Sequence, residues 1–487
     1  MKDTFYLTTT LPYVNAEPHI GFALEIVAAD VIARYQRDIL NNKVIFNTGT
    51  DEHGQKIYQN AIDNNQDPQA YVDHYAAKFE ELKKLLNLSY THFIRTTDKN
   101  HVVAAQKFWE ICNNNGYIYK KEYKTKYCIG CELEKTDSEL DDGKCPLHPN
   151  KELEIREEEN YFFKFSAFQQ PLLALYEKNP EFVKPAGKMK EIKAFVTNGL
   201  QDFSISRLKE KMPWGIQVPN DPNHVMYVWF DALVNYISTL GWPSENSVFN
   251  QFWPGIQVAG KDNLRQQAAM WQAMLLAAKI QPSEQILING FISVDGQKMS
   301  KSLGNVIAPT EMVKRYGVDA TRYLLMNLGP FGTDMDVSWE KLDMVYQSKL
   351  ANNIGNTISR VAKMCENSGI GYQDSYKPWK FKTRKDGEEA IFALDSAKKE
   401  MINFQLRSAL TDISLYTNFI EEKLSKEEPW KLEGEKQKEI LQTAISSIIE
   451  LAKSLQPFMP TVSEKIITHF SQEKITALKP LFPRLEK

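Results

Sequence analysis

The strongest constraint on the fold is the order of structural signals in the first fifty residues. Residues 5–10 are rich in aromatic and β-branched side chains and predict a strand, and residues 11–18 carry two prolines and predict a loop. Apolar side chains then recur at three- and four-residue spacing over residues 19–40, which predicts a helix, and residues 44–46 predict a second strand. Strand, helix and strand in this order make a βαβ unit, so we expect a parallel sheet that binds its ligand beyond the carboxyl ends of the strands.

Length and composition limit the class of protein. The chain has 487 residues, which predicts about two to four domains. It has no apolar run near the roughly 20 residues of a membrane span, and its first residues lack a charged and then apolar leader, so we expect a cytoplasmic protein. Five cysteines are too few for a disulfide scaffold. The net charge of −3 gives no global sign of nucleic-acid binding, so any such contact must use local basic surface.

Two segments suggest a phosphate site. His19-Ile20-Gly21 opens the predicted helix, where free backbone N–H groups suit phosphate, although His19 alone also fits a simple helix cap. Lys298 and Lys301 flank Met299-Ser300 in a glycine-bounded loop after a predicted strand. Two mobile ammonium groups can gather triphosphate charge while the α-phosphate is attacked. The alternative for this loop is a solvated turn that happens to bear lysines.

Four soft or borderline ligands occur in two short knuckles, each with its two ligands separated by two residues. This arrangement predicts a closed, tetrahedral and therefore structural zinc site, against the alternative of coincidental cysteines. The charged stretch between the knuckles is too short for a domain, so the metal would replace a core in a small lobe. Cys112 and Cys365 are isolated and are predicted to be buried apolar residues. The predicted ligands are Cys128, Cys131, Cys145 and His148.

These motifs resemble those of a known family. His19-Ile20-Gly21-Phe22 resembles the HIGH signature of class I aminoacyl-tRNA synthetases, and residues 298–302 match their KMSKS signature letter for letter. The resemblance covers essentially the whole chain. It implies an α/β protein: a Rossmann-type parallel-sheet catalytic domain split by a zinc-bearing insertion and followed by an α-helical bundle domain. It also implies formation of an aminoacyl-adenylate with ATP and Mg²⁺, followed by transfer to the 3′ end of tRNA.

The size of the insertion selects among class I members. The leucine, isoleucine and valine enzymes carry a much larger editing insertion, and the ligand set of the cysteine enzyme does not occur near the reaction loops. The methionine enzymes have a zinc-knuckle insertion of this size, so the resemblance implies a methionine–tRNA ligase that binds L-methionine, ATP, Mg²⁺, one structural Zn²⁺ and tRNA(Met). The expected domains are 1–112 and 224–310 for the two catalytic halves, 113–223 for the insertion, 311–345 for a connecting module and 346–487 for an anticodon-binding bundle.

The resemblance also implies roles for individual residues. Trp229 and Tyr236 offer flat polarizable walls that suit a thioether, although an ordinary core helix is the alternative. Arg207 falls where the family has an arginine in the reaction zone. The expected catalytic residues are His19, Lys298 and Lys301. The expected ATP contacts are Tyr13, Asn15, His19, Gly21, Glu25, Gly260, Asp262, Lys298 and Lys301. The expected methionine contacts are Leu11, Pro12, Tyr13, Asp51, Trp229, Ala232, Tyr236 and Gln267.

Three positions depart from the family pattern. Phe22, Gln267 and Asn289 stand where the family commonly has histidine. Loss of one donor at such a site costs roughly 3–4 kcal/mol, so we expect backbone N–H groups and the two lysines to supply more of the charge stabilisation. The departures leave two alternatives open: a class I synthetase for another apolar amino acid, and a catalytically weak zinc-bearing tRNA-binding paralogue.

The C-terminal part shows long helical periodicity from about residue 341. Trp430 falls where the family stacks a tryptophan on an anticodon base, and Asn352 and Arg360 would flank it; packing of Trp430 in the core is the alternative. The lysine-rich loop at 369–387 predicts either solvated surface or contact with the tRNA backbone. No further module follows the last helix, so we expect a monomer.

Overall fold

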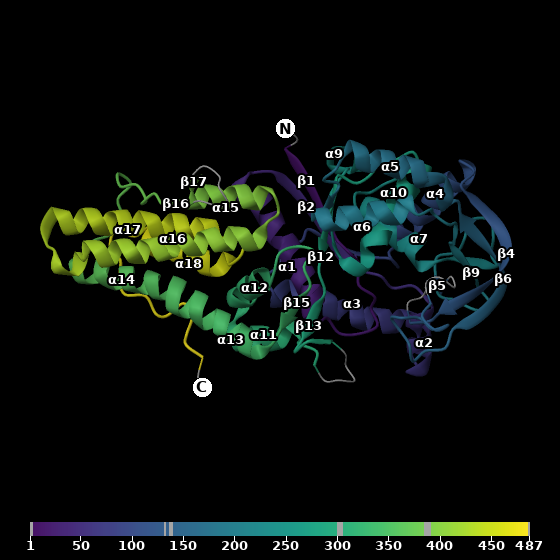
Figure 1. Ribbon diagram of the computed structural model, residues 1–487, viewed down its shortest axis with the longest axis horizontal. Coiled ribbons are helices and arrows are strands. Elements are labelled where there is room, and N and C mark those ends of the chain that lie inside the picture. Colours follow the sequence, from purple (N-terminus) through teal and green to yellow (C-terminus); the bar gives the residue numbers. More distant parts are fainter. Residues whose placement is uncertain (1–2, 131–132, 136–139, 300–304, 384–390, 486–487) are drawn as a thin grey trace. The chain divides into compact units, whose positions relative to one another are not determined.

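The computed structural model describes residues 3–130, 133–135, 140–299, 305–383 and 391–485 (Figure 1). The chain divides into two compact units, and each is built from segments that are distant in the sequence. The first unit comprises Met1–Pro18, Asn42–Lys83 and Ser89–Asn289. The second comprises His19–Asn41, Lys84–Leu88 and Gly290–Lys487.

The first unit contains a parallel sheet. Its six strands, counted over the described residues, lie in the order β3-β2-β1-β11-β12-β7. Leu7 of β1 stands opposite Phe46 of β2, and this pairing confirms the parallel sheet predicted from the first fifty residues. Both strands are buried toward their carboxyl ends, as strands covered on both faces are. The strands are β1 (Thr4–Thr9), β2 (Lys43–Thr50), β3 (His92–Arg95), β7 (Val183–Lys184), β11 (Ile256–Gly260) and β12 (Gln285–Asn289).

An antiparallel sheet within the same unit occupies the predicted insertion. Its described strands follow the order β5-β4-β6-β8, and a second pair joins β9 to β10. β4 and β6 form a long ladder that runs from Ile118 opposite Phe163 to Tyr127 opposite Glu154. The strands are β4 (Ile118–Cys128), β5 (Leu133–Lys135), β6 (Glu154–Phe163), β8 (Phe203–Ser204), β9 (Ser206–Leu208) and β10 (His224–Met226).

Aromatic side chains join the helices of the first unit. The ring of Phe108 lies 5.9 Å from those of Phe230 and Trp242 and 5.6 Å from that of Trp271, between centroids. These contacts connect α4, α7 and α10, so the short helix α7 rests on a rigid base. The helices are α2 (Gln55–Asp63), α3 (Pro68–Leu85), α4 (Lys99–Asn114), α5 (Gln169–Lys178), α6 (Ala186–Thr197), α7 (Val228–Leu233), α8 (Asn235–Ser238), α9 (Phe249–Phe252) and α10 (Trp271–Ala277).

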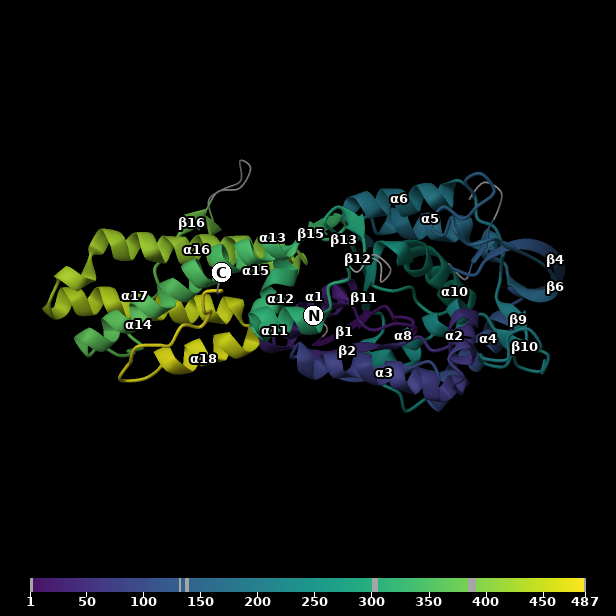
Figure 2. The same cartoon turned by 90° about the horizontal axis from the view of Figure 1, so that it is seen from below.

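The second unit is mainly helical. α14, α16, α17 and α18 run side by side as a bundle (Figures 1 and 2), which confirms the long helical periodicity predicted for the C-terminal part. A small sheet joins β14, β13 and β15. The elements are α1 (Ile20–Arg34), α11 (Pro309–Tyr316), α12 (Val318–Asn327), α13 (Trp339–Val345), α14 (Asn356–Ser368), α15 (Ala393–Ile402), α16 (Leu406–Glu427), α17 (Gly434–Leu455), α18 (Pro460–Phe470), β13 (Ile292–Val294), β14 (Gln297–Lys298), β15 (Met335–Val337), β16 (Lys382–Thr383) and β17 (Ile391–Phe392).

Three helical stretches in the described part of the chain have π-helical geometry, which the 3.6-residue period did not predict. They follow α1, precede α10 and precede α14, at Tyr35–Ile39, Gln266–Met270 and Tyr346–Gly355. Such segments shift the angular spacing of the side chains that follow them and are frequent at functional sites.

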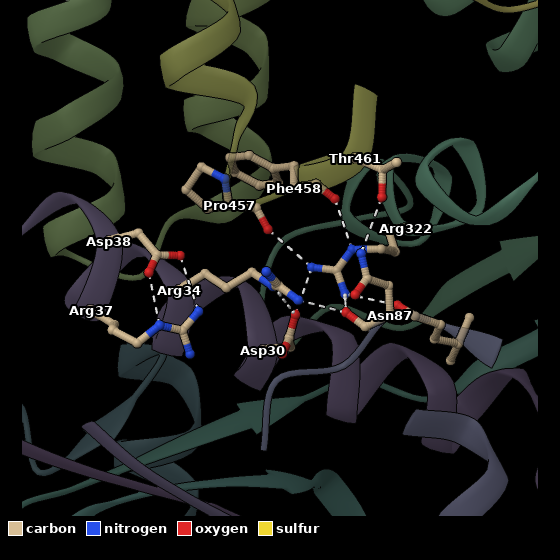
Figure 3. A network of polar contacts seen from close by, with 10 residues as sticks. Asp30, Arg34, Arg37, Asp38, Asn87, Arg322, Pro457, Phe458 and Thr461 are labelled. Atoms are coloured by element: carbon tan, nitrogen blue, oxygen red, sulfur yellow. Dashed lines mark hydrogen bonds and ion pairs between the residues drawn. The ribbon is translucent and has the colours of Figure 1, made fainter. Parts of the chain in front are cut away.

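A buried guanidinium joins four segments of the second unit (Figure 3). Arg322 of α12 is fully buried and lies 2.7 Å from Asp30 of α1. It also donates to the backbone carbonyls of Leu86, Pro457 and Phe458, at 3.1, 3.0 and 2.9 Å. One side chain therefore ties α1 and α12 to residues 84–88 and to the turn between α17 and α18.

No helix among the described residues is long and apolar enough to cross a membrane.

Candidate active site and metal centre

The loop after β1 is fastened to the end of β2. The backbone N–H of Asp51 donates to the carbonyl of Pro12 at 3.0 Å, and the N–H of Val14 donates to the carbonyl of Asp51 at 3.3 Å. Asp51 is buried, whereas Leu11, Pro12 and Tyr13 are half-buried. The structure therefore brings these four predicted methionine contacts together at the carboxyl end of the parallel sheet, where such sheets bind ligands.

Helix α7 lies beside this group of residues. The indole N–H of Trp229 donates to the hydroxyl of Tyr13 at 3.1 Å. Ala232, one turn further along α7, is buried and its small side chain takes little volume. The Trp229 side chain thus contacts the loop that follows β1.

Tyr236 and Gln267 form a buried polar pair in the same unit. The amide of Gln267 donates to the Tyr236 hydroxyl at 2.8 Å, and the backbone carbonyl of Tyr236 accepts from Tyr6 at 2.8 Å. The Tyr236 ring lies 5.9 Å from that of Trp271. Gln267 therefore acts as a hydrogen-bond donor where the family commonly has histidine, but it cannot titrate.

The ends of β11 and β12 lie next to each other. Gly260 is the register partner of Asn289, which is buried. A Cβ atom on Gly260 would meet the Asp262 carboxylate at 2.6 Å, so the glycine allows this exposed acid to fold back over the end of the strand. Gly260 and Asp262 thus lie at the sheet edge where a nucleotide is expected, and Asn15 is half-buried in the first loop.

Arg207 is held between aromatic rings. Its guanidinium lies 5.4 Å from the ring of Tyr127 and 4.5 Å from that of Tyr227, and it donates to the Ser204 hydroxyl and the Ser206 carbonyl at 2.8 and 2.6 Å. A buried, stacked guanidinium in this geometry is fixed in place.

In the second unit, His19 caps the start of α1. Its Nδ1 accepts from the backbone N–H of Gly21 at 3.0 Å. Because Nδ1 accepts, a neutral imidazole carries its hydrogen on Nε2 and can donate there. The cap and the phosphate donor, which the sequence left as alternatives, are therefore compatible. A Cβ atom on Gly21 would lie 2.8 Å from the His19 ring, so a larger residue there would displace the ring from this cap.

The lysine-bearing loop approaches the same helix start. The Cε atom of Met299 lies 3.8 Å from the position that a Cβ on Gly21 would take. Lys298 ends β14, which pairs with β13. Lys301 lies outside the described residues. Glu25, one turn into α1 from Gly21, is buried.

Asp336 of β15 secures the hairpin that leads into this loop. Its carboxylate accepts from the hydroxyl of Ser293 at 2.8 Å and from the backbone N–H of Gly296 at 2.7 Å, and it lies 2.7 Å from the ammonium of Lys341. Together these contacts, led by that with Lys341, lower the pKa of Asp336 to about 2. The carboxylate is therefore ionised at neutral pH and keeps the hairpin closed.

The metal ligands predicted from the knuckles converge. Cys128 at the end of β4, Cys145 and His148 present their ligand atoms within 4.8 Å of one another. The two sulfurs lie 3.9 and 4.0 Å from Nδ1 of His148. With Zn–S near 2.3 Å and Zn–N near 2.0 Å, a tetrahedral angle gives an S–N distance of about 3.5 Å, so the two observed S–N distances are close to those of a zinc site. Cys131 lies outside the described residues.

Gly130 is part of this arrangement. A Cβ atom at this position would lie 2.5 Å from the His148 ring, so only glycine lets the ring lie across the first knuckle. Cys112 and Cys365 are buried elsewhere, as predicted, and burial raises the pKa of the Cys365 thiol to about 12.

In the helical bundle, Trp430 follows α16. It is 45% exposed, which disfavours the alternative that it packs in the core. The Arg360 guanidinium lies 4.7 Å from its ring centroid and pairs with Glu421 at 2.7 Å. Asn352 is exposed but belongs to the π-helical stretch, so the helical period that placed it on one face with Arg360 does not apply there.

Sequence reasoning missed a set of buried polar residues beneath the Asp51 loop and α7. They are Glu52, His53, His101 and Asp231, and the half-buried Trp214 contacts Glu52 and His53. The acidic and histidine residues that follow Asp51 were a usable signal, because they lie directly at the end of a parallel strand. Asp231 gave none, since it lies in an otherwise apolar segment.

Comparison with known proteins finds relatives that match nearly the whole of this chain. Residues 5–152 and 134–362 match the family model described as tRNA synthetases class I (M). The methionine–tRNA ligase of Rickettsia typhi is 38% identical over 97% of this chain and 94% of its own length. That of Thermotoga maritima is 37% identical over 96% of this chain and 76% of its own.

Solved structures are similar along the whole chain. Mycobacterium tuberculosis methionyl-tRNA synthetase in complex with methionyl-adenylate matches with a TM-score of 0.88 and 33% identity over 99% of each chain. The apo form of that enzyme matches with a TM-score of 0.83 and 29% identity, over 100% of this chain and 99% of its own.

Proposed function

This chain belongs to the methionine branch of the class I aminoacyl-tRNA synthetases, and from that premise we propose how its residues divide the work of a methionine–tRNA ligase. The enzyme activates L-methionine with ATP to methionyl-adenylate and transfers the methionyl group to the 3′ end of tRNA. The observation that supports the residue roles most strongly is the convergence of Asp51, Tyr13 and Trp229 at the carboxyl end of the sheet.

Methionine binds between the Asp51 loop and α7. Asp51 pairs with the substrate ammonium, because a buried carboxylate attracts a cation strongly. Trp229 and Tyr236 face the thioether, and Ala232 leaves room for it. Leu11, Pro12 and Tyr13 close the site from the first loop, and Gln267 orients the Tyr236 hydroxyl. This division gives separate anchors to the ammonium and to the side chain.

In the activation step a carboxylate oxygen of methionine attacks the α-phosphorus of ATP, and diphosphate leaves. Negative charge spreads over the phosphate oxygens, and preorganised donors stabilise it. His19 donates from Nε2, the backbone N–H groups at the start of α1 add partial positive charge, and Lys298 and Lys301 attract the leaving diphosphate. Mg²⁺ supplies further positive charge to the triphosphate when bound.

Further nucleotide contacts are proposed for residues of each unit. Asp262 accepts from the ribose, Gly260 and Gly21 allow close backbone approach, and Tyr13, Asn15 and Glu25 complete the set. Phe22 removes one donor, so Phe22→His should raise the rate of adenylate formation. An unchanged rate would mean that phenylalanine at position 22 does not slow adenylate formation.

The knuckles hold one structural Zn²⁺ through Cys128, Cys131, Cys145 and His148. With four protein ligands the ion has no open position and stabilises the lobe between β4 and β6. Cys145→Ser should reduce bound zinc from about one per chain to a trace, measured by atomic absorption. Full zinc content in that variant would exclude Cys145 as a ligand.

The helical bundle recognises the anticodon of tRNA(Met). Trp430 offers an exposed face on which a base can stack, at roughly 1–3 kcal/mol per base. Arg360 lies over that ring, and Asn352 lies on the preceding helical stretch. We further propose that the protein acts as a cytoplasmic monomer, with its catalytic halves, insertion, connecting module and bundle divided at residues 112, 223, 310 and 345.

Amino-acid-dependent exchange of labelled diphosphate into ATP tests the activity directly. Methionine alone among the twenty amino acids should support rapid exchange, because only its side chain fits the site. Exchange with a different apolar amino acid would indicate a synthetase of that specificity. No exchange with any of them would indicate a tRNA-binding paralogue.

A further inference from the structure

A second buried acid lies close to the proposed methionine site. Asp231 of α7 is fully buried, and its Oδ2 lies 3.1 Å from Nδ1 of His53. Its other oxygen lies 4.0 Å from Nε2 of His101, whose Nδ1 contacts the Ser238 hydroxyl at 3.0 Å. Because a carboxylate can only accept, Nδ1 of His53 carries a hydrogen and donates to Asp231.

The charge of Asp231 depends on these imidazoles. Burial alone raises the pKa of a carboxyl, but His53 and His101 together hold the pKa of Asp231 below its ordinary value of 3.8. Asp231 is therefore ionised at neutral pH inside the protein. A buried charge of this kind is kept only with its partners, so the His53 contact has a defined geometry.

His53 belongs to a loop that is fixed from its other side. The indole N–H of Trp214 donates to the carbonyl of Glu52 at 2.6 Å, and the Trp214 ring lies 5.6 Å from the His53 ring. The Glu52 carboxylate accepts two hydrogen bonds from Arg95, at 2.6 and 2.9 Å. The loop that presents Asp51 is thus held by several contacts, and His53 connects it to α7.

Asp231 lies in α7 between two residues that are proposed to line the methionine side chain. Trp229 precedes it by two positions and Ala232 follows it directly. The contact between His53 and Asp231 therefore joins the loop that holds the ammonium anchor to the helix that holds the side-chain wall. The distance between this loop and α7 decides which amino-acid substrates are long enough to contact both.

We propose that His53 and Asp231 are positioning residues that set the distance between the ammonium anchor and the thioether wall, and so the preference for methionine. The proposal rests on the methionine site described above. Neither residue touches the substrate in it; each acts through its neighbours, Asp51 on one side and Trp229 with Ala232 on the other. The second oxygen of Asp231 lies 4.0 Å from Nε2 of His101, and Ser238 contacts the other nitrogen of that ring.

Three variants test the role. His53→Leu removes the donor at similar volume, whereas His53→Asn keeps a nitrogen donor at the place of Nδ1. His224→Leu is the matched control, because Nδ1 of the buried His224 lies 3.0 Å from Asp221, in a histidine–aspartate contact at the boundary between the insertion and the second catalytic half. Each variant is compared with the wild type in diphosphate exchange, with methionine and ATP varied separately, and in thermal unfolding.

The expected result is a selective change. His53→Leu raises KM for methionine at least about tenfold while KM for ATP changes less than about twofold, since only the methionine walls are displaced. It also lowers the preference for methionine over ethionine and 2-aminobutyrate, which differ in side-chain length. His53→Asn restores KM for methionine to within about threefold of the wild type. His224→Leu changes only the melting temperature.

Other results overturn the proposal. These are an unchanged KM for methionine and unchanged selectivity in His53→Leu, equal increases in both KM values, or the same increase in His224→Leu. If His53→Leu fails to fold, tryptophan fluorescence titration of His53→Asn and Asp231→Asn with methionine alone decides. Affinity near wild type in the first and at least about tenfold weaker in the second supports the proposal, and any other pattern rejects it. Absence of methionine-dependent exchange in the wild type would instead contradict the proposed function.

Discussion

Both units contain an aspartate buried away from solvent beside basic side chains, and the two aspartates have different partners. Asp231 in the first unit faces two imidazoles, whereas Asp30 in the second faces the guanidinium groups of Arg322 and Arg34, both within 2.8 Å. An imidazole offers one or two donors on a short side chain, while a guanidinium offers five in a fixed plane. The imidazole contacts of Asp231 suit the positioning of one element against another. The guanidinium contacts of Asp30 can join several chain segments at once.

The other contacts of the basic residues around Asp30 and Asp231 agree with this difference. The donors of Arg322 that do not contact Asp30 bind backbone carbonyls of residues 86, 457 and 458, so its loss would release parts of the fold. The imidazoles of His53 and His101 instead contact polar side chains of α7 and α8. We therefore expect substitutions in the Asp30 cluster to act on stability and those in the Asp231 cluster to act on methionine recognition.

The largest expected effect is that of Arg322→Met. It removes one of the two guanidinium partners of Asp30 and the donors of three buried carbonyls, so the free energy of unfolding should fall by about 3–5 kcal/mol. Denaturant unfolding measures the loss. Arg315→Met is the control, because the Arg315 pair with Asp343 is solvent-exposed and should be worth less than about 1 kcal/mol. Equal losses in the two variants would contradict the structural role of Arg322.

A smaller effect is expected for the coupling between His53 and Asp231. A double-mutant cycle with His53→Leu and Asp231→Asn should give an interaction free energy of about 0.5–3 kcal/mol in unfolding, since the side chains are in contact. The cycle should give coupling of the same sign in the free energy of methionine binding. Coupling in unfolding without coupling in binding would reduce the pair to a stabilising contact.

The pH dependence of the free energy of unfolding should have opposite signs for Asp231 in the first unit and Asp319 in the second. The folded pKa of Asp231 is lowered, so its contribution to stability is full above the unfolded pKa and is lost as the pH falls through the folded value. Burial instead raises the pKa of Asp319, which lies beside the Asp30 cluster and accepts from the backbone N–H of Val462 at 2.5 Å. Its ionised form is disfavoured in the folded state, so acidification through its folded pKa adds stability.

Unfolding of Asp231→Asn and Asp319→Asn between pH 3 and 7 separates these effects. Relative to each variant, the wild type should lose stability on acidification in the first case and gain it in the second. A tenfold difference between the acid dissociation constants of the folded and unfolded states corresponds to about 1.4 kcal/mol of stability. The same sign in both cases would show that the two acids have similar environments.

Much of this molecule was predictable because its signals are local. The parallel pairing of β1 with β2, the position of His19 at the start of α1 and the convergence of Cys128, Cys145 and His148 all follow from spacing within short segments. The proposed methionine contacts of Trp229 and Tyr236 came from their aromatic side chains and from resemblance to the family, and they stay a prediction.

The remaining features depend on contacts between distant parts of the chain. Asp231 and His53 are 178 positions apart, and Arg322 and Phe458 are 136 apart, so no periodicity joins them. The role of a charged residue in an apolar segment cannot be predicted from the sequence until the partner that compensates its charge is known. The π-helical stretches were missed for a related reason, since packing and not local propensity selects that geometry.

The most direct test of these two roles compares KM for methionine in Asp231→Asn with that in Asp30→Asn, measured by diphosphate exchange at a temperature where both are folded. We predict an increase of at least about tenfold in Asp231→Asn and a value within about twofold of the wild type in Asp30→Asn. Equal values of KM in the two variants would contradict the claim that the acid with imidazole partners serves the site and the acid with guanidinium partners serves the fold.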